Sequence, residues 1–369
     1  MGREQISTTD ATYLMFSVIS AKIFLSVPRY LVLDGETAGW LFVLMAGATG
    51  ALGWTFVVLF MRRFPGRSIL QAVEETLGPY LAIPANLLYT FIFLIITAVV
   101  IRQLGETVIS AILPTTPISV IIGTLLAVAV YTCYLGKEAV ARVARFFMPV
   151  IVALVLAILV LSLPSGARPS ELLPLFGPGI GTLLMRSISR SSLFVEVLLL
   201  PLLVPHLKEP EKMARIGYQA ILWSTLFWLA VTAVFLMLFP YPEAVKNPFP
   251  LLALARLINI GRFLQRVESV FIFAWIFAAA AKISATLLAS TLSFAETFHL
   301  KAYRPMVFAF SVLAMSLSFL PPNIIEAMRW DREIIRVWGA LPGFVLPLVL
   351  WGIAAARGKG GQQRAGEKD

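Results

Sequence analysis

The stretch SLFVEVLLLPLLVP, residues 192–205, places one glutamate, Glu196, inside a run that is otherwise almost entirely apolar. A charged side chain near the centre of a lipid bilayer costs at least ~2.5 kcal/mol, so such residues are rare and usually face the interior of a helix bundle. Lys22 and Lys282 lie near the middle of two other long apolar stretches. Three charges at similar depths in three different stretches predict a polar site at the membrane midplane.

The composition places the chain among integral membrane proteins. Of its 369 residues, 59% are hydrophobic and only 14% are charged, whereas a soluble domain has roughly 25% charged residues. The net charge of +10 is assigned to the membrane surface and to topology, because no patch of interleaved aromatic and basic residues indicates a nucleic-acid partner. The single cysteine, Cys133, excludes an intramolecular disulfide. No Cys/His cluster has the spacing of a metal site, so neither a metal nor a cofactor is expected.

Windows of about 20 apolar residues predict an all-α integral membrane fold with ten spans. The spans cover residues 10–33, 38–61, 80–103, 115–135, 143–163, 184–205, 215–239, 266–296, 304–322 and 337–356. No small-residue cleavage site follows the first span, which is therefore interpreted as a retained helix. Lysine and arginine moderately favour the side of the N-terminus, so both termini are expected in the cytoplasm. Residues 1–357 are expected to form one transmembrane domain, and residues 358–369 a basic disordered tail.

Prolines predict breaks in two of the spans. Span one is interrupted at Pro28 and span six at Pro201 and Pro205, and each carries its charge upstream of its proline. Proline leaves helical carbonyls without a donor, which a membrane tolerates only inside protein or beside water. Interrupted helices at corresponding places in two halves are typical of inverted-repeat transporters. We therefore expect five plus five spans, with repeats at about 10–163 and 184–356.

Two loops are predicted to contain helices of their own. Ser68 and Gln71 form a capping-box pattern before a short amphipathic segment that Gly78-Pro79 ends. Residues 323–338 mix apolar and charged side chains with helical spacing, which predicts a helix lying on the outer surface of the membrane.

The loops also carry a family resemblance. Residues 62–68, Arg-Arg-Phe-Pro-Gly-Arg-Ser, resemble the K/R-R-F-P-G-K/R-S signature of the B subunits of spore germinant receptors. This family is a branch of the amino acid–polyamine–organocation transporter superfamily. Further matches follow in order over roughly residues 3–357: Leu104-Gly105-Glu106, Gly136-Lys137-Glu138 with Ala141-Arg142, Phe194-Val195-Glu196 (family F-G-E), residues 259–268 (family S-I-G-D-F-L-E-R-L-D), Lys282-Ile283-Ser284 and Tyr303-Arg304-Pro305.

The resemblance implies a ten-helix, amino-acid-transporter-like fold that senses nutrients, commonly amino acids, in the spore inner membrane. It implies two partners, a membrane-embedded A subunit and a C-subunit lipoprotein, besides the lipid bilayer and the nutrient. It also places a ligand beside the breaks in spans one and six, at Ser20, Ala21, Lys22, Phe194, Val195 and Glu196. The chain departs from the family where glycine is usual, at residues 20–23 and at Val195, and both changes reduce access to the backbone.

Each intramembrane charge has a functional and a structural interpretation. Glu196 either binds a ligand ammonium or a proton, or forms a buried ion pair with Lys22 or Lys282. Lys282, with the nearby Ser284, either replaces a coupling cation by tethering spans one and eight or is the structural partner of Glu196. Lys22 either meets a ligand carboxylate or belongs to the same ion pair.

Three further residues are candidates for the site. Arg190 and the serines at 187, 189, 191 and 192 either line a hydrated vestibule that attracts an anion, or combine a snorkelling arginine with serines bonded to helical carbonyls. Tyr89 and Thr97 either line the site or pack between helices.

Enzyme classes find no support in the sequence. It contains no G-x-S-x-G, H-E-x-x-H, P-loop or dinucleotide-binding pattern. Two functions fit the charged spans and the resemblance: a receptor subunit that binds a nutrient and signals through partners, and a proton-coupled amino-acid transporter. A third possibility is a scaffold that has lost ligand binding together with the glycines. Of these we favour the receptor subunit.

Overall fold

The computed structural model describes residues 5–258 and 267–360, and nearly all of its regular structure is helical. Within these residues the only β-pairing is an isolated bridge between Ile6 and Leu207. The α-helices are α1 (Thr8–Ser20), α2 (Val27–Gly35), α3 (Gly39–Met61), α4 (Ile69–Leu77), α5 (Pro79–Ala111), α6 (Ile118–Leu135), α7 (Lys137–Ser162), α8 (Ile180–Ser189), α9 (Leu199–Leu203), α10 (Met213–Leu238), α11 (Tyr241–Ala244), α12 (Pro250–Leu257), α13 (Val267–Thr297), α14 (Arg304–Ser318), α15 (Ile324–Arg329), α16 (Arg336–Trp338) and α17 (Leu346–Ala356).

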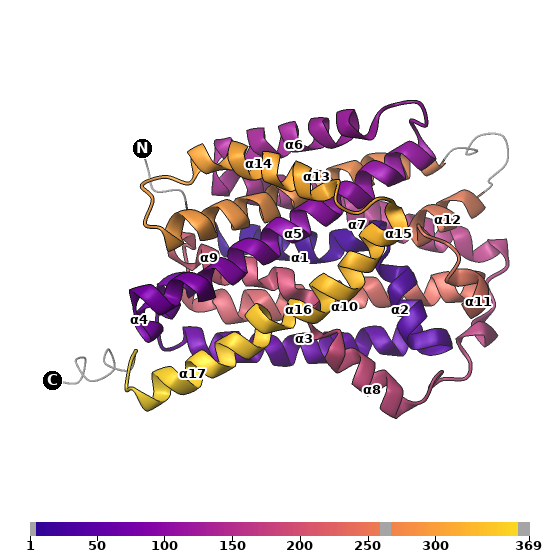
Figure 1. The fold of residues 1–369 in the computed structure, drawn as a ribbon. Coiled ribbons are helices and arrows are strands. Elements are labelled where there is room, and N and C mark those ends of the chain that lie inside the picture. The colour runs from indigo at the N-terminus through magenta and orange to yellow at the C-terminus, as the bar shows by residue number, and fades with distance from the viewer. Residues whose placement is uncertain (1–4, 259–266, 361–369) are drawn as a thin grey trace.

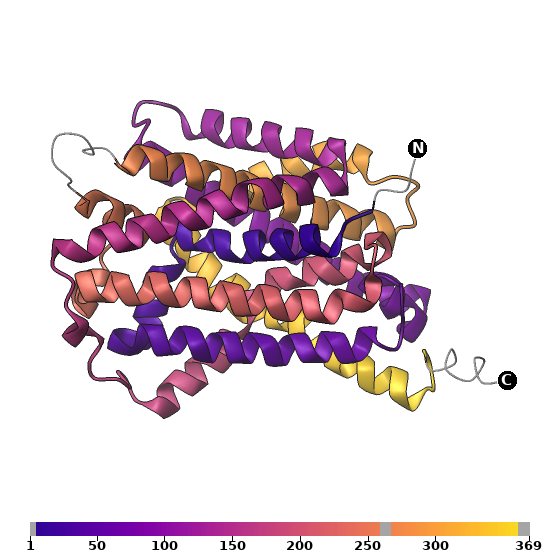
Figure 2. The same cartoon turned by 180° about the vertical axis from the view of Figure 1, so that it is seen from behind.

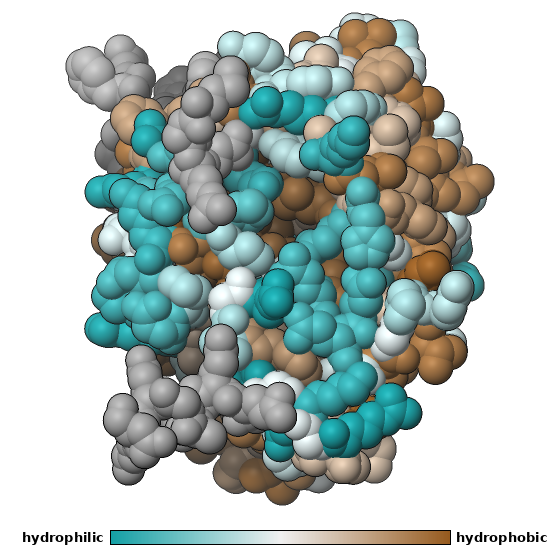
Figure 3. Space-filling view, turned by 90° about the vertical axis from the view of Figure 1, so that its left-hand side faces the viewer, coloured by the Kyte–Doolittle hydropathy of each residue, from teal (hydrophilic) through white to brown (hydrophobic). Residues whose placement is uncertain are grey.

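The predicted all-helical membrane fold is confirmed. In the described part of the chain, eight helices are long and apolar enough to cross a membrane. Together with α1 and the shorter apolar helix α14, they cover the ten predicted spans. The long helices run side by side, and the chain enters and leaves the bundle at the same end (Figure 1). Hydrophilic residues gather over that end, while brown, apolar residues occupy one flank of the same view (Figure 3). This distribution is the one expected of a bundle that crosses a bilayer.

Helices α1 and α13 occupy the interior of the bundle. Helix α1 lies between α7 and α10, as the view from behind shows (Figure 2). Helix α13 packs against α5, α6, α7 and α14. Residues on these two helices are therefore surrounded by protein on most sides, which is the setting that an intramembrane charge requires.

Segment one, formed by α1 and α2, is broken as predicted, although the break lies upstream of Pro28 rather than at it. Helix α1 ends at Ser20, a 3₁₀ turn covers Ala21–Phe24, and Leu25 leaves the helical region with φ −104° and ψ −144°. Helix α2 then begins at Val27 with Pro28 in its first turn, where the missing N–H of proline costs nothing. The break forms although residues 20–23 contain no glycine.

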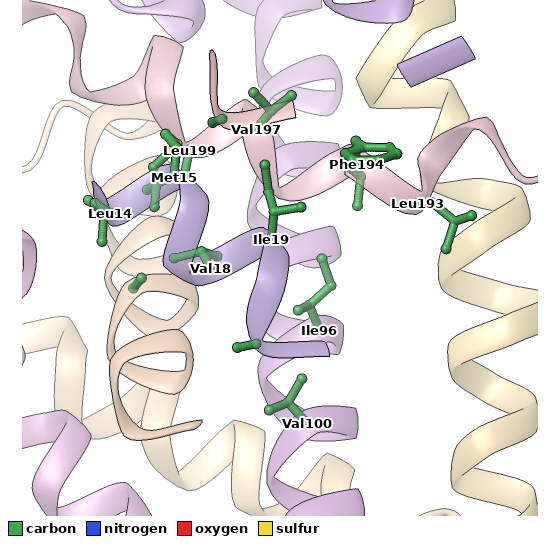
Figure 4. Close-up of a cluster of buried hydrophobic side chains, with 14 of the residues drawn as sticks. Leu14, Met15, Val18, Ile19, Ile96, Val100, Leu193, Phe194, Val197 and Leu199 are labelled. Atoms are coloured by element: carbon green, nitrogen blue, oxygen red, sulfur yellow. The ribbon is translucent and has the colours of Figure 1, made fainter. Parts of the chain in front are cut away.

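Segment six, formed by α8 and α9, is broken in the same way. Helix α8 ends at Ser189, and a 3₁₀ stretch follows over Ser191–Leu198, in which Phe194 has non-helical angles of φ −108° and ψ 17°. The break lies upstream of Pro201 rather than at it. Apolar side chains of α1, α5 and this stretch gather around the two breaks (Figure 4), among them Val18, Ile19, Ile96, Leu193, Phe194 and Val197.

Helix α3 presents a stripe of glycines to its neighbours. A Cβ atom would lie 2.4 Å from Thr225 Oγ1 at Gly47, 2.6 Å from the Phe194 ring at Gly50 and 1.8 Å from the Phe344 ring at Gly53. Glycine at every third position therefore lets α10, segment six and the last segment approach the α3 backbone closely.

The last segment, segment ten, corrects one prediction. Residues 324–356 form a single helical span that includes two π-helical stretches, Trp330–Ile335 and Leu341–Val345. Asp331 and Arg336 are buried in it. The prediction that residues 323–338 lie on the outer surface is therefore wrong, because Arg336 pairs with Asp331 and Glu196 inside the protein, although Arg329 and Glu333 are exposed.

The remaining loop predictions have mixed outcomes. The capping box of Ser68 and Gln71 is present at the start of α4, and Gly78 ends the helix with φ 86°. Residues 259–266 of the family-like motif and residues 361–369 of the predicted tail lie outside the described residues.

The close packing of α3 against α10 can be tested at Gly217. A Cβ atom there would lie 2.2 Å from the ring of Trp54, which is fully buried and cannot move aside. Gly217→Ala is expected to destabilise the protein by about 1–3 kcal/mol through overpacking. The measurement is the melting temperature of the detergent-solubilised protein. Gly123→Ala on α6 is the matched control, because no atom lies near its Cβ position. Equal melting temperatures for the two variants would contradict the packing.

Candidate functional site

Glu196, in the break of segment six, lies at the centre of a buried set of charges. Its Oε2 atom lies 2.7 Å from Lys22 Nζ of segment one, and its Oε1 atom lies 2.9 Å from Lys282 Nζ of α13. Arg336 Nη1 of segment ten lies 3.8 Å from the same Oε1. Glu196 and Lys282 are 0% exposed, Lys22 2% and Arg336 3%. Four segments therefore meet at one carboxylate, shielded from water.

The two lysines also bind the backbone at the breaks. Lys22 Nζ donates a hydrogen bond to the carbonyl of Leu193, and Lys282 Nζ donates one of 3.0 Å to the carbonyl of Val18. A broken helix leaves carbonyls without their intrahelical N–H partners, and inside a membrane these oxygens need another donor. The ammonium groups supply that donor in this chain.

Arg336 joins segment ten to the break of segment six. Its Nη2 atom lies 2.6 Å from Asp331 Oδ1, and its Nη1 atom donates to the carbonyl of Ser192 over 3.4 Å. In return, the Ser192 hydroxyl donates to the carbonyls of Ile335 and Arg336. We call Lys22, Glu196, Lys282, Asp331 and Arg336 the Glu196 cluster. It holds three cations and two carboxylates, a net charge of +1 among the described residues.

An aromatic wall covers one side of the cluster. The Trp228 ring of α10 lies 5.1 Å from Lys22 Nζ, a distance at which a cation–π attraction operates. Phe194 lies against the same indole with ring centroids 5.0 Å apart. Both side chains are fully buried. They exclude water from Lys22 and so strengthen its attraction to Glu196.

The other predicted residues near the breaks have structural contacts. The Ser20 and Ser224 hydroxyls are 2.9 Å apart, while Ala21 and Val195 are buried within the 3₁₀ stretches. Ser284 donates to the carbonyl of Ala280 in its own helix. No hydrogen bond or ion pair in the described structure joins the side chains of Ser20, Ala21, Val195 or Ser284 to the Glu196 cluster.

Thr97 and Tyr89 lie on α5, beside α13. Thr97 Oγ1 lies 2.8 Å from Thr286 Oγ1, and Thr286 in turn donates to the carbonyl of Lys282. Thr97 thus supports the helical turn that carries Lys282. Tyr89 is fully buried, and its hydroxyl has no hydrogen bond to the described residues.

Arg190 belongs to a neighbouring cluster. Its Nε atom lies 3.5 Å from Asp34 Oδ2, and Arg332 Nη2 lies 2.5 Å from Asp34 Oδ1. Arg186 donates to the Asp34 carbonyl, and Arg190 donates to that of Arg332. Arg332 and Arg336 are one helical turn apart, so segment ten connects this arginine–Asp34 cluster with the Glu196 cluster. The hydroxyls of Ser187 and Ser189 bond to carbonyls of their own helix.

Sequence reasoning missed three residues of the site: Asp331, Arg336 and Trp228. A signal for the first two existed, because residues 324–338 contain no glycine or proline and continue directly toward the apolar residues of the tenth span. A helix running through both stretches would have carried Arg336 into the bundle. For Trp228 the sequence offers no signal beyond an aromatic residue in an apolar span.

Comparisons with known proteins identify one family over most of the chain. The family described as spore germination protein matches residues 5–324. Spore germination protein KB of Bacillus subtilis (strain 168) is 26% identical over 347 residues, which are 92% of this chain and 93% of that protein. Spore germination protein YndE of the same organism is 24% identical over 354 residues, 94% of this chain and 97% of that protein.

Solved transporters share the fold. The nucleobase-cation-symport-1 family transporter Mhp1 superposes with a TM-score of 0.68 at 13% identity, covering 96% of this chain and 94% of that one. MhsT, in complex with L-phenylalanine, gives a TM-score of 0.68 at 14% identity, covering 97% and 91%. The predicted transporter-like fold is therefore confirmed. At these identities the likeness concerns the fold alone.

The charge balance of the cluster predicts that losing its central carboxylate destabilises the protein, and that losing a lysine as well restores part of the stability. Glu196→Gln leaves the cations facing only Asp331 and is expected to cost about 3–5 kcal/mol. Adding Lys282→Met removes one excess cation and should recover part of that loss. The measurement is a double-mutant cycle of unfolding free energies in mixed micelles. The exposed pair Glu138 and Arg142, 2.6 Å apart, is the control, with an expected coupling of about 0.3–0.5 kcal/mol. Additive effects at Glu196 and Lys282 would contradict their pairing.

Proposed function

Because the chain belongs to the spore germination protein family, we propose that it is the membrane subunit of a spore germinant receptor. In this proposal it binds a small nutrient, with amino acids as the expected class, at the Glu196 cluster. The bound nutrient changes the conformation of the bundle, and partner subunits read that change.

One observation carries the proposal: a single buried carboxylate contacts residues of segments one and ten and of α13, while itself lying in the break of segment six. A ligand that engages any of these groups changes the contacts of all four elements at once. A ligand shifts a conformational equilibrium only by the difference between its affinities for the two states. In the described structure Glu196 pairs with Lys22, Lys282 and Arg336, and in the proposed liganded state some of these contacts are rearranged.

The position of Lys282 supports a receptor whose nutrient binding does not require a coupling cation. Its ammonium group lies between the Val18 carbonyl of segment one and the Glu196 carboxylate. A positive charge in this position tethers α13 to segments one and six in the way that a bound cation would. Nutrient binding is therefore proposed to be independent of sodium.

The second candidate is a proton-coupled amino-acid transporter. The solved proteins that share the fold are transporters, and Glu196 is an acid beside both broken segments. In that function the same site would open alternately to each side of the membrane, with Glu196 carrying the proton. Uptake, rather than binding, separates the two candidates.

The assembly and location form part of the same proposal. The partners are an A-type membrane subunit and a C-type lipoprotein, and the location is the spore inner membrane with both termini in the cytoplasm. Relatives that include spore germination proteins KB and B2 support a role in germination.

Glu196→Asp tests the site while keeping its charge. The shorter side chain cannot reach Lys22 and Lys282 together, so nutrient affinity should fall by about tenfold or more, a loss of about 1.4 kcal/mol or more. Binding of an amino-acid panel to the purified protein and uptake into proteoliposomes with an inward proton gradient are measured in parallel. Glu138→Asp, at an exposed position, is the control. Binding without uptake supports the receptor, and concentrative uptake supports the transporter. Unchanged affinity in folded Glu196→Asp would exclude this site.

A further inference from the structure

The Glu196 cluster carries more positive than negative charge. Lys22, Lys282 and Arg336 face only two carboxylates, those of Glu196 and Asp331, in the described structure. All five side chains are at least nine-tenths buried. An uncompensated buried charge is costly, because the interior solvates it far less well than water does. Counted with all five groups ionised, the cluster is therefore one negative charge short of neutrality.

The acceptors that a ligand ammonium would need are already occupied. The Leu193 carbonyl and Glu196 Oε2 accept from Lys22, while the Val18 carbonyl and Glu196 Oε1 accept from Lys282. An incoming ammonium would have to displace one of these lysines. It would also raise the excess of cations over carboxylates from one to two, unless the ligand's own carboxylate compensated it. The arrangement is thus unfavourable to recognition through an amine.

Buried donors, in contrast, remain available. Arg336 Nε and Trp228 Nε1 have no hydrogen-bond partner among the described residues, although Arg336 is 3% and Trp228 0% exposed. A buried N–H without an acceptor costs about 1–3 kcal/mol. Trp228 borders the cluster through Lys22, and Arg336 is part of it. Two unpaired donors and one excess positive charge describe a site that lacks an anionic acceptor.

We propose that the nutrient is recognised through a carboxylate and that its ammonium group is not required. One carboxylate would accept hydrogen bonds from Arg336 Nε and Trp228 Nε1 and neutralise the excess charge of the cluster. The ligand class is small monocarboxylates, which includes amino acids held by their carboxylate end. This inference rests on the proposed function, since it assumes that the cluster is the nutrient site.

The arginine–Asp34 cluster gives an anion a favourable approach. Arg190 and Arg332 have side chains 17% and 26% exposed, and Arg332 lies one turn from the buried Arg336. Positive charge therefore extends from partly exposed positions to the cluster. Such an arrangement raises the local concentration of anions and disfavours cations.

The test compares matched compounds on the purified full chain by titration calorimetry. The twenty amino acids are tested first, together with the trios L-alanine, propanoate and ethylamine, and L-phenylalanine, 3-phenylpropanoate and 2-phenylethylamine. For any other amino acid that binds, its deaminated acid and its decarboxylated amine are added. We expect the deaminated acid to bind at least as tightly as its amino acid and to compete with it, and the amine not to bind.

The possible failures are distinguishable. If an amine binds as tightly as its amino acid, or if amino acids bind and their deaminated acids do not, the carboxylate inference is overturned while the proposed function stands. If no amino acid and no carboxylate binds, the nutrient site itself is excluded, and the inference fails with it.

Two substitutions locate the carboxylate. Trp228→Phe removes the N–H and keeps an aromatic ring, and Arg336→Lys keeps the charge and removes Nε. Each should weaken binding of the deaminated acid by about tenfold in protein that elutes as a folded species. Trp223→Phe on α10 and Arg329→Lys on α15 are matched controls, because both side chains are exposed. Wild-type affinity in both Trp228→Phe and Arg336→Lys would overturn the assignment to these donors.

Discussion

The structure depends on one constraint: two helices are broken inside a membrane, and every polar group released by the breaks must find a partner without water. The Leu193 and Val18 carbonyls meet this requirement through the ammonium groups of Lys22 and Lys282. Those ammonium groups need a counter-charge, which Glu196 provides. Backbone geometry and buried charge therefore stabilise each other, since an isolated lysine or glutamate at this depth would cost several kcal/mol.

The same network couples distant parts of the chain. Glu196 lies in segment six, its partners lie on segments one and ten and on α13, and Arg336 continues through the π-helical stretch of segment ten to Arg332 and Asp34. Under the proposed function, a change at Glu196 would be transmitted as an exchange of ion-pair partners among these segments. A rigid glycine-lined contact on α3 lies beside this network, because Gly50 meets Phe194 and Gly53 meets Phe344.

The sequence was sufficient for the spans, for the presence of a break in segments one and six and for the three central charges, because each leaves a local signal: the length of an apolar run, a nearby proline, or a charge within an apolar run. It did not place the breaks, which lie upstream of Pro28 and Pro201. It failed for segment ten. The charged residues of 324–338 resemble the polar face of a surface helix, and only Asp34 and Glu196, more than a hundred residues away in the chain, make that face compatible with burial. The contacts of Ser20, Ser284 and Tyr89 could not be predicted from the sequence either, since they depend on how α1, α5 and α13 pack.

The absence of glycine at the breaks has a chemical consequence. A glycine at position 195 or within residues 20–23 would let a ligand approach the free carbonyls and N–H groups of the backbone directly. In this chain the carbonyls are instead capped by lysines, so the groups left for a ligand are side-chain donors, Arg336 Nε and Trp228 Nε1. In the proposed site, recognition would therefore depend on a net positive cluster, which suits an anion, rather than on backbone dipoles.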